Sequence, residues 1–402
     1  MSTMAVRERL LTARFALVVG AGLAYFLSLG MVLPVVPQYV EDRLGGGSVA
    51  VGVAVGTLFV GAVLFRPWVG RLGDRTGRRL LMIAGAAIVA GSVVLYGAVE
   101  SLPFLVAVRA LTGVGEAAFF VGAATMITDL APVERRGEAI SYWSVAVYGG
   151  LAFGPALGET VLEATSFGTV WLVAGGLALV ATALSVFTHD IERPAAPADQ
   201  GPLVNRAAIA PGTVLFCGLI ALAAFTAFVP LYVDDVGLDG AEGVFILYGG
   251  LVLVVRIFGA RLPDILGGRR SGAIALTGTA VGMGVMAAWG TAAGLFTGTV
   301  AFALGASMLY PALLLLALER GGEEERASVV GTVSTFFDLS QGLGSLLVGA
   351  VAAVTSYQGA FAAGAVFAVI GFLLLRYGSA ARVSRTATVA DEGAFAAEHP
   401  GP

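Results

Sequence analysis

Long apolar runs separated by short polar segments dominate this chain. Six runs carry no charged side chain, at residues 15–40, 44–65, 80–99, 139–158, 164–188 and 207–233. Each has roughly the 20 apolar residues that a helix needs to cross the hydrocarbon core of a membrane. Uninterrupted runs of this kind indicate spanning helices, because the strands of a spanning barrel would alternate apolar and polar positions.

Two longer uncharged runs, 271–318 and 339–375, have room for two helices each, because a glycine-containing turn lies in the middle of both. Segments 102–127 and 242–262 contain charged residues but are otherwise long and apolar enough to be spanning helices as well. Open sheets cannot span lipid, since the backbone groups at their edges would lack hydrogen-bond partners. The pattern therefore predicts an all-α integral membrane protein with twelve transmembrane helices.

The composition agrees with lipid as the surrounding solvent. Of 402 residues, 57% are hydrophobic and 12% are charged, which is about half the charged fraction of a soluble domain. A soluble enzyme and a disordered chain are therefore excluded for most of the length. One cysteine, Cys217, and two histidines, His189 and His399, leave no disulfide and no basis for a metal site or a catalytic triad. We expect no cofactor, metal ion, catalytic residue or nucleic-acid partner.

Basic residues are distributed unevenly between the two sides that twelve spans define. All 23 are arginines, and all but Arg43 and Arg109 lie on one side or at helix ends that face it. Because cytoplasmic loops are enriched in arginine and lysine, this side is predicted to be cytoplasmic. Both termini then lie in the cytoplasm, and the chain is expected to be a multi-pass protein of the cytoplasmic membrane.

Short motifs recur 190 residues apart. The pattern R-x4-R-L-G-D that begins at Arg66 matches R-x4-R-L-P-D from Arg256, and a Gly-Arg-Arg triplet follows each. We therefore predict two six-helix repeats, with a substrate site between them near the middle of the membrane. The expected division is a cytoplasmic N-terminus (1–14), an N-terminal bundle (15–188), a cytoplasmic linker (189–206), a C-terminal bundle (207–377) and a disordered cytoplasmic tail (378–402).

Four short patterns resemble those of the major facilitator superfamily. Residues 70–79, G-R-L-G-D-R-T-G-R-R, look like the family's loop motif G-x-L-x-D-R-x-G-R-[KR], and R-x3-G-x-G from Arg109 is similar to its fourth-helix pattern. G-x3-G-P-x2-G from Gly150 resembles a motif of exporters, and P-x-x-P from Pro34 looks like the drug-exporter branch. The resemblance covers about residues 10–380. It implies a twelve-helix secondary transporter that resembles the drug/metabolite:proton antiporters.

The resemblance also implies a cytoplasmic latch that closes one conformational state. Asp74 would meet the positive N-terminal end of the eleventh spanning helix near residues 326–328, and Arg78 would pair with Asp129. Gly70 and Gly77 would provide tight turns in a short loop. The alternative is that the arginines serve only as topology signals. The residues assigned to the latch are Gly70, Asp74, Arg75, Gly77, Arg78 and Asp129.

Gly150, Gly154 and Gly158 recur every four residues and place a small-residue groove on one face of the fifth helix, beside Pro155. Proline removes an intrahelical hydrogen bond and kinks a helix. We expect this helix to be kinked and to pack tightly against the opposite half of the protein. Ordinary small-residue packing is the alternative.

Two charges inside the fourth span are the strongest candidates for coupling. Glu116 lies seven residues after Arg109, so both project from one helix face about 10.5 Å apart along the axis. Charged groups at this depth usually line a cavity or a proton path, and we expect both in a cleft between the halves. A static Glu–Arg pair is the alternative. The second-repeat counterparts are Thr299 and Ala306, so the fold itself does not require the pair.

A second intramembrane acid, Asp338, lies near Gln341 in the eleventh spanning helix, and its first-repeat counterpart is Tyr148. It is either a proton or substrate residue or a partner for a neighbouring helix. Gln341 and Tyr310 are predicted to line the substrate cavity. Tyr25, Tyr148 and Tyr248 are further candidates, for which packing is the alternative.

These features favour a monomeric secondary transporter that exports a small organic solute by alternating access in exchange for protons. A proton- or sodium-coupled importer or uniporter of the same fold remains the alternative, and so does a membrane receptor or scaffold that does not transport. A membrane enzyme would need clustered histidines, cysteines or paired acidic motifs, and the sequence has none.

Overall fold

The computed structural model describes residues 12–132, 135–190, 204–259, 262–320 and 326–377, and this part of the chain is helical apart from its turns. The N-terminal half consists of α1 (Ala13–Asp42), α2 (Ser48–Thr76), α3 (Arg78–Leu95), α4 (Leu102–Leu130), α5 (Arg136–Ala164) and α6 (Phe167–Val186). The C-terminal half consists of α7 (Arg206–Tyr232), α8 (Glu242–Phe258), α9 (Leu262–Leu266), α10 (Gly268–Ala288), α11 (Ala292–Leu318), α12 (Arg326–Val354) and α13 (Tyr357–Tyr377).

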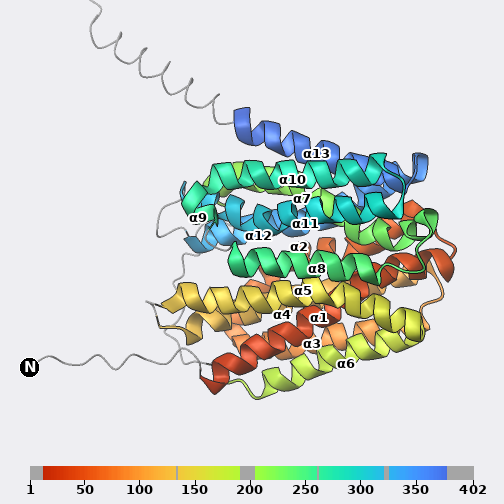
Figure 1. The fold of residues 1–402 in the computed structure, drawn as a ribbon. Coiled ribbons are helices and arrows are strands. Elements are labelled where there is room, and N and C mark those ends of the chain that lie inside the picture. The colour runs from red at the N-terminus through yellow and green to blue at the C-terminus, as the bar shows by residue number, and fades with distance from the viewer. Residues whose placement is uncertain (1–11, 133–134, 191–203, 260–261, 321–325, 378–402) are drawn as a thin grey trace, which may run out of the picture.

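The predicted twelve-helix membrane architecture is confirmed. Among the described residues, eleven helices are long and apolar enough to cross a membrane. The twelfth long helix, α8, has 17 residues and lies between α5 and α11 in the bundle (Figure 1). The expected linker and tail fall largely in 191–203 and 378–402, outside the described residues, so the division of the chain at those points stays a prediction.

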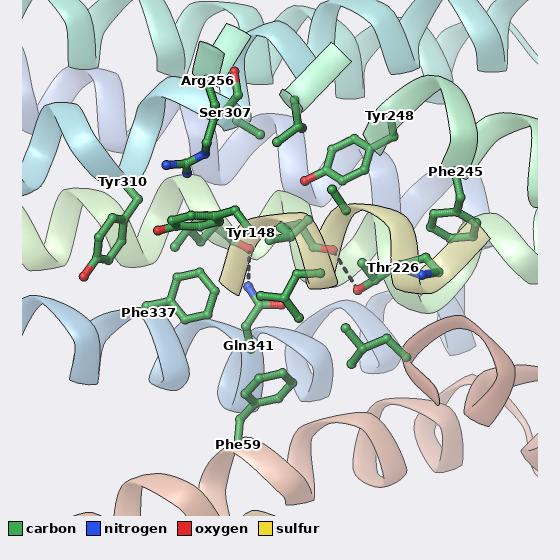
Figure 2. Close-up of a pocket in the computed structure, with 18 residues that line it drawn as sticks. Phe59, Tyr148, Thr226, Phe245, Tyr248, Arg256, Ser307, Tyr310, Phe337 and Gln341 are labelled. Carbon is green, nitrogen blue, oxygen red and sulfur yellow. Dashed lines mark hydrogen bonds between the residues drawn. The ribbon is translucent and has the colours of Figure 1, made fainter. Parts of the chain in front are cut away.

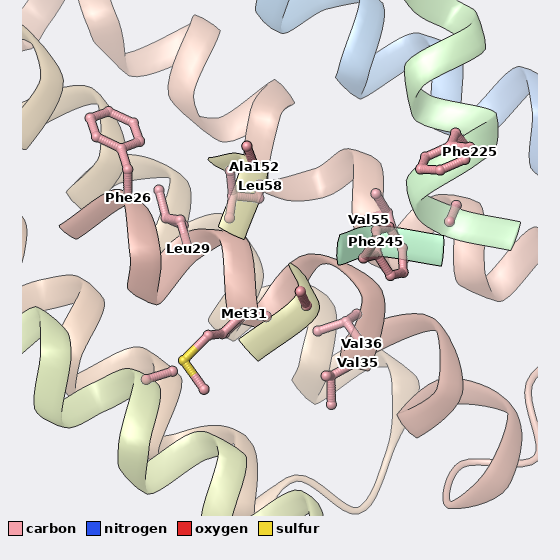
Figure 3. Close-up of a cluster of buried hydrophobic side chains, with 14 of the residues drawn as sticks. Phe26, Leu29, Met31, Val35, Val36, Val55, Leu58, Ala152, Phe225 and Phe245 are labelled. Carbon is pink, nitrogen blue, oxygen red and sulfur yellow. The ribbon is translucent and has the colours of Figure 1, made fainter. Parts of the chain in front are cut away.

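The two halves use the same packing scheme. In the N-terminal half α1 packs on α5 and α6, while α3 packs on α4 and α6; in the C-terminal half α7 packs on α11, α12 and α13, while α10 packs on α11 and α13. The halves meet where α2 lies along α12 and α5 lies along α8 (Figure 1). One cluster of buried apolar side chains runs through both halves, from Phe26 and Met31 of α1 to Phe225 of α7 and Phe245 of α8 (Figure 3).

Small residues bring the halves together where α2 begins and α12 ends, the end expected to face outside. A Cβ added to Gly349 of α12 would lie 2.7 Å from the carbonyl oxygen of Ser48, and one added to Gly56 of α2 would collide with the carbonyl oxygen of Gly342. Glu41 accepts a 2.7 Å hydrogen bond from the hydroxyl of Tyr357 at the same end. Close backbone approach of this kind is how helices associate in lipid, where apolar burial gives little driving force.

The repeated motif folds in the same way in both halves. Gly77 and Gly267 have φ values of 92° and 80°, which favour glycine, and each directly precedes or caps a helix start. Arg79 donates to the carbonyl oxygen of Val186 at 2.7 Å, and Arg269 donates to that of Arg376 at the same distance. All of these residues are 190 positions from their counterparts, so the repeat extends to individual hydrogen bonds.

The predicted loop at 70–77 is only partly correct. Residues 70–76 continue α2 as helix to Thr76, and the chain turns at Gly77 alone. A helix that extends beyond the membrane satisfies its own backbone groups, so an arginine-rich stretch can stay helical in water. Gly70 therefore does not form a turn.

Candidate functional site

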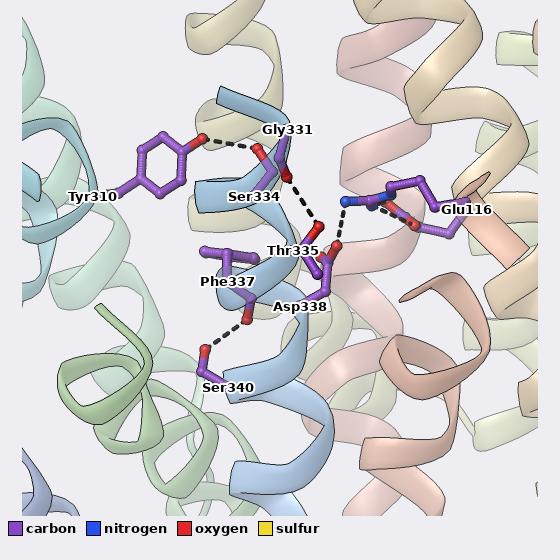
Figure 4. A network of polar contacts seen from close by, with 9 residues as sticks. Glu116, Tyr310, Gly331, Ser334, Thr335, Phe337, Asp338 and Ser340 are labelled. Carbon is purple, nitrogen blue, oxygen red and sulfur yellow. Dashed lines mark hydrogen bonds and ion pairs between the residues drawn. The ribbon is translucent and has the colours of Figure 1, made fainter. Parts of the chain in front are cut away.

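One arginine joins two buried carboxylates at the interface between the halves. A guanidinium nitrogen of Arg66 on α2 lies 3.1 Å from Oε2 of Glu116 on α4, and another forms an ion pair with Asp338 on α12. Figure 4 shows the Glu116 and Asp338 side chains directed toward each other. The three side chains are 16%, 8% and 7% exposed, in the order Arg66, Glu116, Asp338. The ring of Phe120 covers the guanidinium, with its centroid 5.0 Å from Cζ.

The structure corrects the expected partner of Glu116. Arg109 faces α2, as Glu116 does, but it donates to the carbonyl oxygens of Ala54 at 2.9 Å and Val55 at 3.2 Å and is completely buried. Two helical turns separate Arg109 from Glu116, so Arg109 donates to the nearer carbonyl groups while Arg66 reaches Glu116 from the facing helix. Arg109 therefore binds α4 to α2 within one half.

A cavity of about 90 Å³ lies between the halves. The side chains that line it come from both: Leu33, Phe59, Tyr148, Leu151, Ala152 and Pro155 from the N-terminal half, and Leu219, Leu222, Thr226, Phe245, Tyr248, Val252, Arg256, Ala306, Ser307, Tyr310, Phe337 and Gln341 from the C-terminal half (Figure 2). Most of the lining is apolar or aromatic, with a few polar groups, as is typical of sites for small organic molecules.

Four of the residues named in the sequence analysis line this cavity. Tyr310 and Gln341 line the cavity, as do Tyr148 and Tyr248. The amide of Gln341 donates to the carbonyl oxygen of Leu219, and the hydroxyl of Tyr310 lies 3.1 Å from that of Ser334 on α12 (Figure 4). Tyr310 and Gln341 therefore both contact the cavity and have side chains that hydrogen bonds hold in one orientation.

Other predicted residues lie away from the cavity. Tyr25 is buried in packing, with its ring stacked 3.9 Å from that of Phe119. Glu116, Arg109 and Asp338 are not among the lining residues. The charged cluster and the cavity nevertheless share α12, because Phe337 and Gln341 occupy one helical face while Asp338 projects from the adjacent face toward α2.

The glycines of the fifth helix face a helix of the same half, which corrects the prediction that they pack on the opposite half. A Cβ added to Gly154 would lie 2.6 Å from Cα of Gly30 on α1, and Gly150 and Gly158 also abut α1. Because α1 and α5 belong to one repeat, this groove builds the N-terminal half.

A different face of α5 meets the C-terminal half. A Cβ added to Gly249 of α8 would collide with the carbonyl oxygen of Ala152, and Pro155 lines the cavity. The helix runs unbroken from Arg136 to Ala164 with Pro155 inside it. The missing hydrogen bond of Pro155 thus lies beside the cavity rather than at a helix end.

The cytoplasmic latch is only partly visible. The side chains of Asp74 and Arg326, and the surroundings of Gly70, lie outside the described residues, so the contact predicted for Asp74 stays a prediction. Arg75 is exposed at the end of α2. The pairing of Arg78 with Asp129 also stays a prediction.

Asp190 occupies a position that the sequence analysis did not consider. Its Oδ1 accepts hydrogen bonds of 2.9 Å from the backbone amides of Arg78 and Arg79. A carboxylate here satisfies unpaired N–H groups at the start of α3 and complements the positive helix end. The general rule that carboxylates favour helix N-termini could have suggested it, but its distance in sequence from α3 could not.

Comparison with known proteins now identifies the family. The family model of the Major Facilitator Superfamily matches residues 18–292 and 244–398. The chain belongs to the Major Facilitator Superfamily. An MFS-type transporter of Salmonella typhimurium, STM4428, is 28% identical over 365 residues, which cover 87% of this chain and 94% of that protein. The MFS-type transporter YhhS of Escherichia coli is 26% identical over 381 residues, 90% of this chain and 92% of YhhS.

A solved structure shares the fold. A mutant of the nucleoside transporter NupG superposes with a TM-score of 0.74 at 12% identity, over 90% of this chain and 99% of that one. Membership of the superfamily and the match to MFS-type transporters make this chain a multi-pass membrane transporter and not an enzyme. Its architecture is consistent with movement of a small-molecule substrate by alternating access.

The sequence analysis does not single out two arginines that the structure places at the interface between the halves. Arg66 and Arg256 count there among the arginines of the cytoplasmic side, whereas in the structure Arg66 binds both buried acids and Arg256 lines the cavity. A signal existed in the repeat, because these arginines occupy equivalent positions at the ends of apolar runs. Buried acids at positions 116 and 338 also required a cation, and Arg66 is the first arginine after an uncharged run in α2.

Proposed function

We propose that this transporter exports a small organic solute across the cytoplasmic membrane as a monomer, in exchange for protons. The observation that carries the proposal is the bridge from Arg66 to Glu116 in its own half and to Asp338 in the other half. A single guanidinium lies between two carboxylates that belong to different halves. The protonation state of these carboxylates therefore affects the contact between the two halves.

The charge of this cluster supports proton uptake. One guanidinium and two ionised carboxylates leave a net charge of −1 on side chains that are at most 16% exposed in helices expected to span the membrane. Net charge at this depth is costly, so binding of one proton, which makes the cluster neutral, is favoured. The cluster is thus suited to exchange one proton between states with different access to water.

Protonation at Asp338 would change the contact between α2 and α12. A neutral carboxyl attracts a guanidinium far less than a carboxylate does. Arg66 would then stay paired with Glu116, which lies in the same N-terminal half. The ion pair between the halves would then be lost while the pair within one half remains. This is the coupling that alternating access requires, because one chemical event favours separation of the halves.

Solute binding is coupled to the same helix. Phe337 and Gln341 of α12 line the cavity on either side of Asp338 in sequence. Movement of α12 that follows loss of the Asp338 ion pair would therefore reshape the cavity. The outward direction rests on the resemblance of the glycine–proline motif in α5 to that of exporters.

The test uses purified protein in proteoliposomes. Glu116→Gln and Asp338→Asn keep the shape of each side chain but prevent its ionisation, and both are expected to abolish accumulation driven by a pH gradient while solute exchange survives. The exposed loop residue Asp239→Asn is the matched control and should keep gradient dependence. If gradient-driven accumulation is unchanged in both cluster variants, the proton-carrier assignment is wrong. Accumulation in the same direction as the proton flow would instead indicate an importer.

A further inference from the structure

Arg256 brings a positive charge to the cavity without a carboxylate to balance it. Its Cζ lies 3.3 Å from the ring centroid of Tyr148 across the interface between the halves, and its Nε is buried without a hydrogen-bond partner. Figure 2 shows the guanidinium directed toward Tyr148. Within the described residues Arg256 makes no ion pair, whereas Arg66 makes two.

Contact with an aromatic ring does not satisfy this guanidinium. A ring lies on the face of the guanidinium plane, where it attracts the positive charge but accepts no hydrogen bond in that plane. The Nε–H of Arg256 has no hydrogen-bond partner, and no carboxylate among the described residues neutralises its charge. An arginine held in this way is prepared to bind a planar anion with two parallel hydrogen bonds.

The repeat shows what is missing around Arg256. Arg66 is its counterpart in the N-terminal half and binds Glu116 and Asp338. The counterparts of these two acids are Ala306 and Tyr148, and both line the cavity together with Arg256. The same arrangement of helices therefore contains one arginine with two built-in carboxylates and one arginine with none.

We propose that the cavity binds a small organic monoanion, whose carboxylate occupies the position beside Arg256 that the repeat leaves without an acid. The inference rests on the proposed transport function, for which it names the substrate class. Ala306 leaves the space that a longer acidic side chain would fill. The tyrosine rings and apolar side chains of the lining would contact an apolar or aromatic body of the anion.

The rest of the lining agrees with an anion rather than a cation. Arg256 is the one charged residue among the side chains given above for this cavity, and the other polar groups are hydroxyls and an amide. A cationic solute would face Arg256 with no acid nearby to offset the repulsion. A membrane potential that is negative inside also favours outward movement of an anion, in agreement with export.

The experiment compares molecules that share a body and differ in charge. Benzoate, benzamide and benzylamine, and hexanoate, hexanamide and hexylamine, are added to the purified full-length protein, and binding is measured from thermal stabilisation and from intrinsic tryptophan fluorescence. At neutral pH we expect the two carboxylates to bind and the amides and amines to bind at least about tenfold more weakly, since a hydrogen bond to a charged group contributes at least that factor. Equal or tighter binding of the amides or amines would overturn the inference, and so would no binding of either carboxylate at its solubility limit.

Variants of Arg256 assign the effect to this side chain. Arg256→Gln should lose the preference for carboxylates, and Arg256→Lys should retain part of it because the charge remains but the planar fork does not. Arg14→Gln is the matched control, since Arg14 is exposed at the start of α1. Unchanged carboxylate affinity in Arg256→Gln would contradict the proposal.

A second variant keeps the test decisive if Arg256→Gln does not fold. Ala306→Glu places at this position the residue type of its counterpart Glu116, so the new carboxylate should pair with Arg256 and exclude the solute. We expect a protein at least as heat-stable as the wild type that no longer binds benzoate or hexanoate. Wild-type affinity in a stable Ala306→Glu protein would overturn the assignment of Arg256.

The outcomes for this inference and for the proposed function can be distinguished. Carboxylate binding that depends on Arg256, combined with transport that ignores the pH gradient, would support the inference and reject proton coupling. Gradient-driven transport of amides or amines that Glu116→Gln abolishes would reject the inference and support proton coupling.

Discussion

Arg66 and Arg109 are both arginines on membrane-spanning helices, but their acceptors differ in kind. Arg66 binds two carboxylates that can take up protons, whereas Arg109 binds two backbone carbonyl oxygens that cannot. The first arrangement can change with pH and the second is fixed. The proposed coupling therefore involves the Arg66 cluster, whereas Arg109 joins α4 to α2.

The role of Arg109 gives a prediction at this scale. Arg109→Lys keeps the charge but cannot donate to both carbonyl groups in the same geometry, so it should lose roughly 1.5–3 kcal/mol of stability. Thermal unfolding of the purified protein in detergent should show a lower melting temperature than for the wild type, and Arg14→Lys should not. A variant that is fully stable but has lost gradient-driven transport would return Arg109 to the coupling machinery.

Residue patterns identified part of the site. The charges at 109, 116 and 338 stood out because charged groups are rare in spanning helices, and Tyr310 and Gln341 do line the cavity. The pairing among the charges did not follow from the sequence. It depends on which helices face each other. Both Arg66 and Arg256 lie at the ends of apolar runs, where arginines usually mark the cytoplasmic side of a membrane protein.

At the scale of helices, glycines decide which helices can touch. Gly56 of α2 lies against the backbone of α12 at Gly342, whereas Gly91 of α3 has nothing within 4 Å of where its Cβ would stand. Both are glycines in the interior of a predicted span, and the sequence does not distinguish them. The contact of α2 with α12 brings the halves together toward the expected outer end of their interface.

This difference predicts unequal effects of one methyl group. Gly56→Ala should force α2 and α12 apart and reduce the transport rate several-fold, because backbone atoms cannot yield as a side chain can. Gly91→Ala should leave the rate unchanged and slightly favour the helix. The measurement is solute flux in proteoliposomes with matched protein content. Equal rates for the two variants would show that this contact does not limit transport.

The glycine motif of α5 illustrates the limit of reading a helix alone. Spacing every four residues correctly predicted a groove for a neighbouring helix. The neighbour is α1 of the same half rather than a helix of the opposite half. Periodicity determines the face of a helix, and only the arrangement of the bundle determines what covers it.

For the whole molecule, the cavity and the charged cluster lie side by side between two halves that share one packing scheme. Opposite movements of proton and solute require that binding of one affects binding of the other. The face of α12 that carries Phe337 and Gln341 and the adjacent face that carries Asp338 provide this link.

The direction of transport is tested on membranes that contain the transporter. Everted vesicles, with the cytoplasmic face outside, should accumulate a transported solute such as benzoate when their interior is acidified, because protons leaving the lumen drive solute into it. The same vesicles should not accumulate it when the outside is acidified, because protons that enter the lumen would drive solute out. Accumulation only with the acid outside would mean that proton and solute move in the same direction, as in a proton-coupled importer.

The sequence by itself determined the membrane environment, the twelve helices, the repeat and the family, because each depends on local apolar length, charge and motif. Tertiary structure alone decided that Glu116 pairs with Arg66, that Arg109 binds backbone, and that Arg256 stands beside the cavity without an acid. Those outcomes depend on side chains more than forty residues apart meeting across helix interfaces. Charge and periodicity along a chain do not show which helices pack against each other, so they cannot predict these contacts.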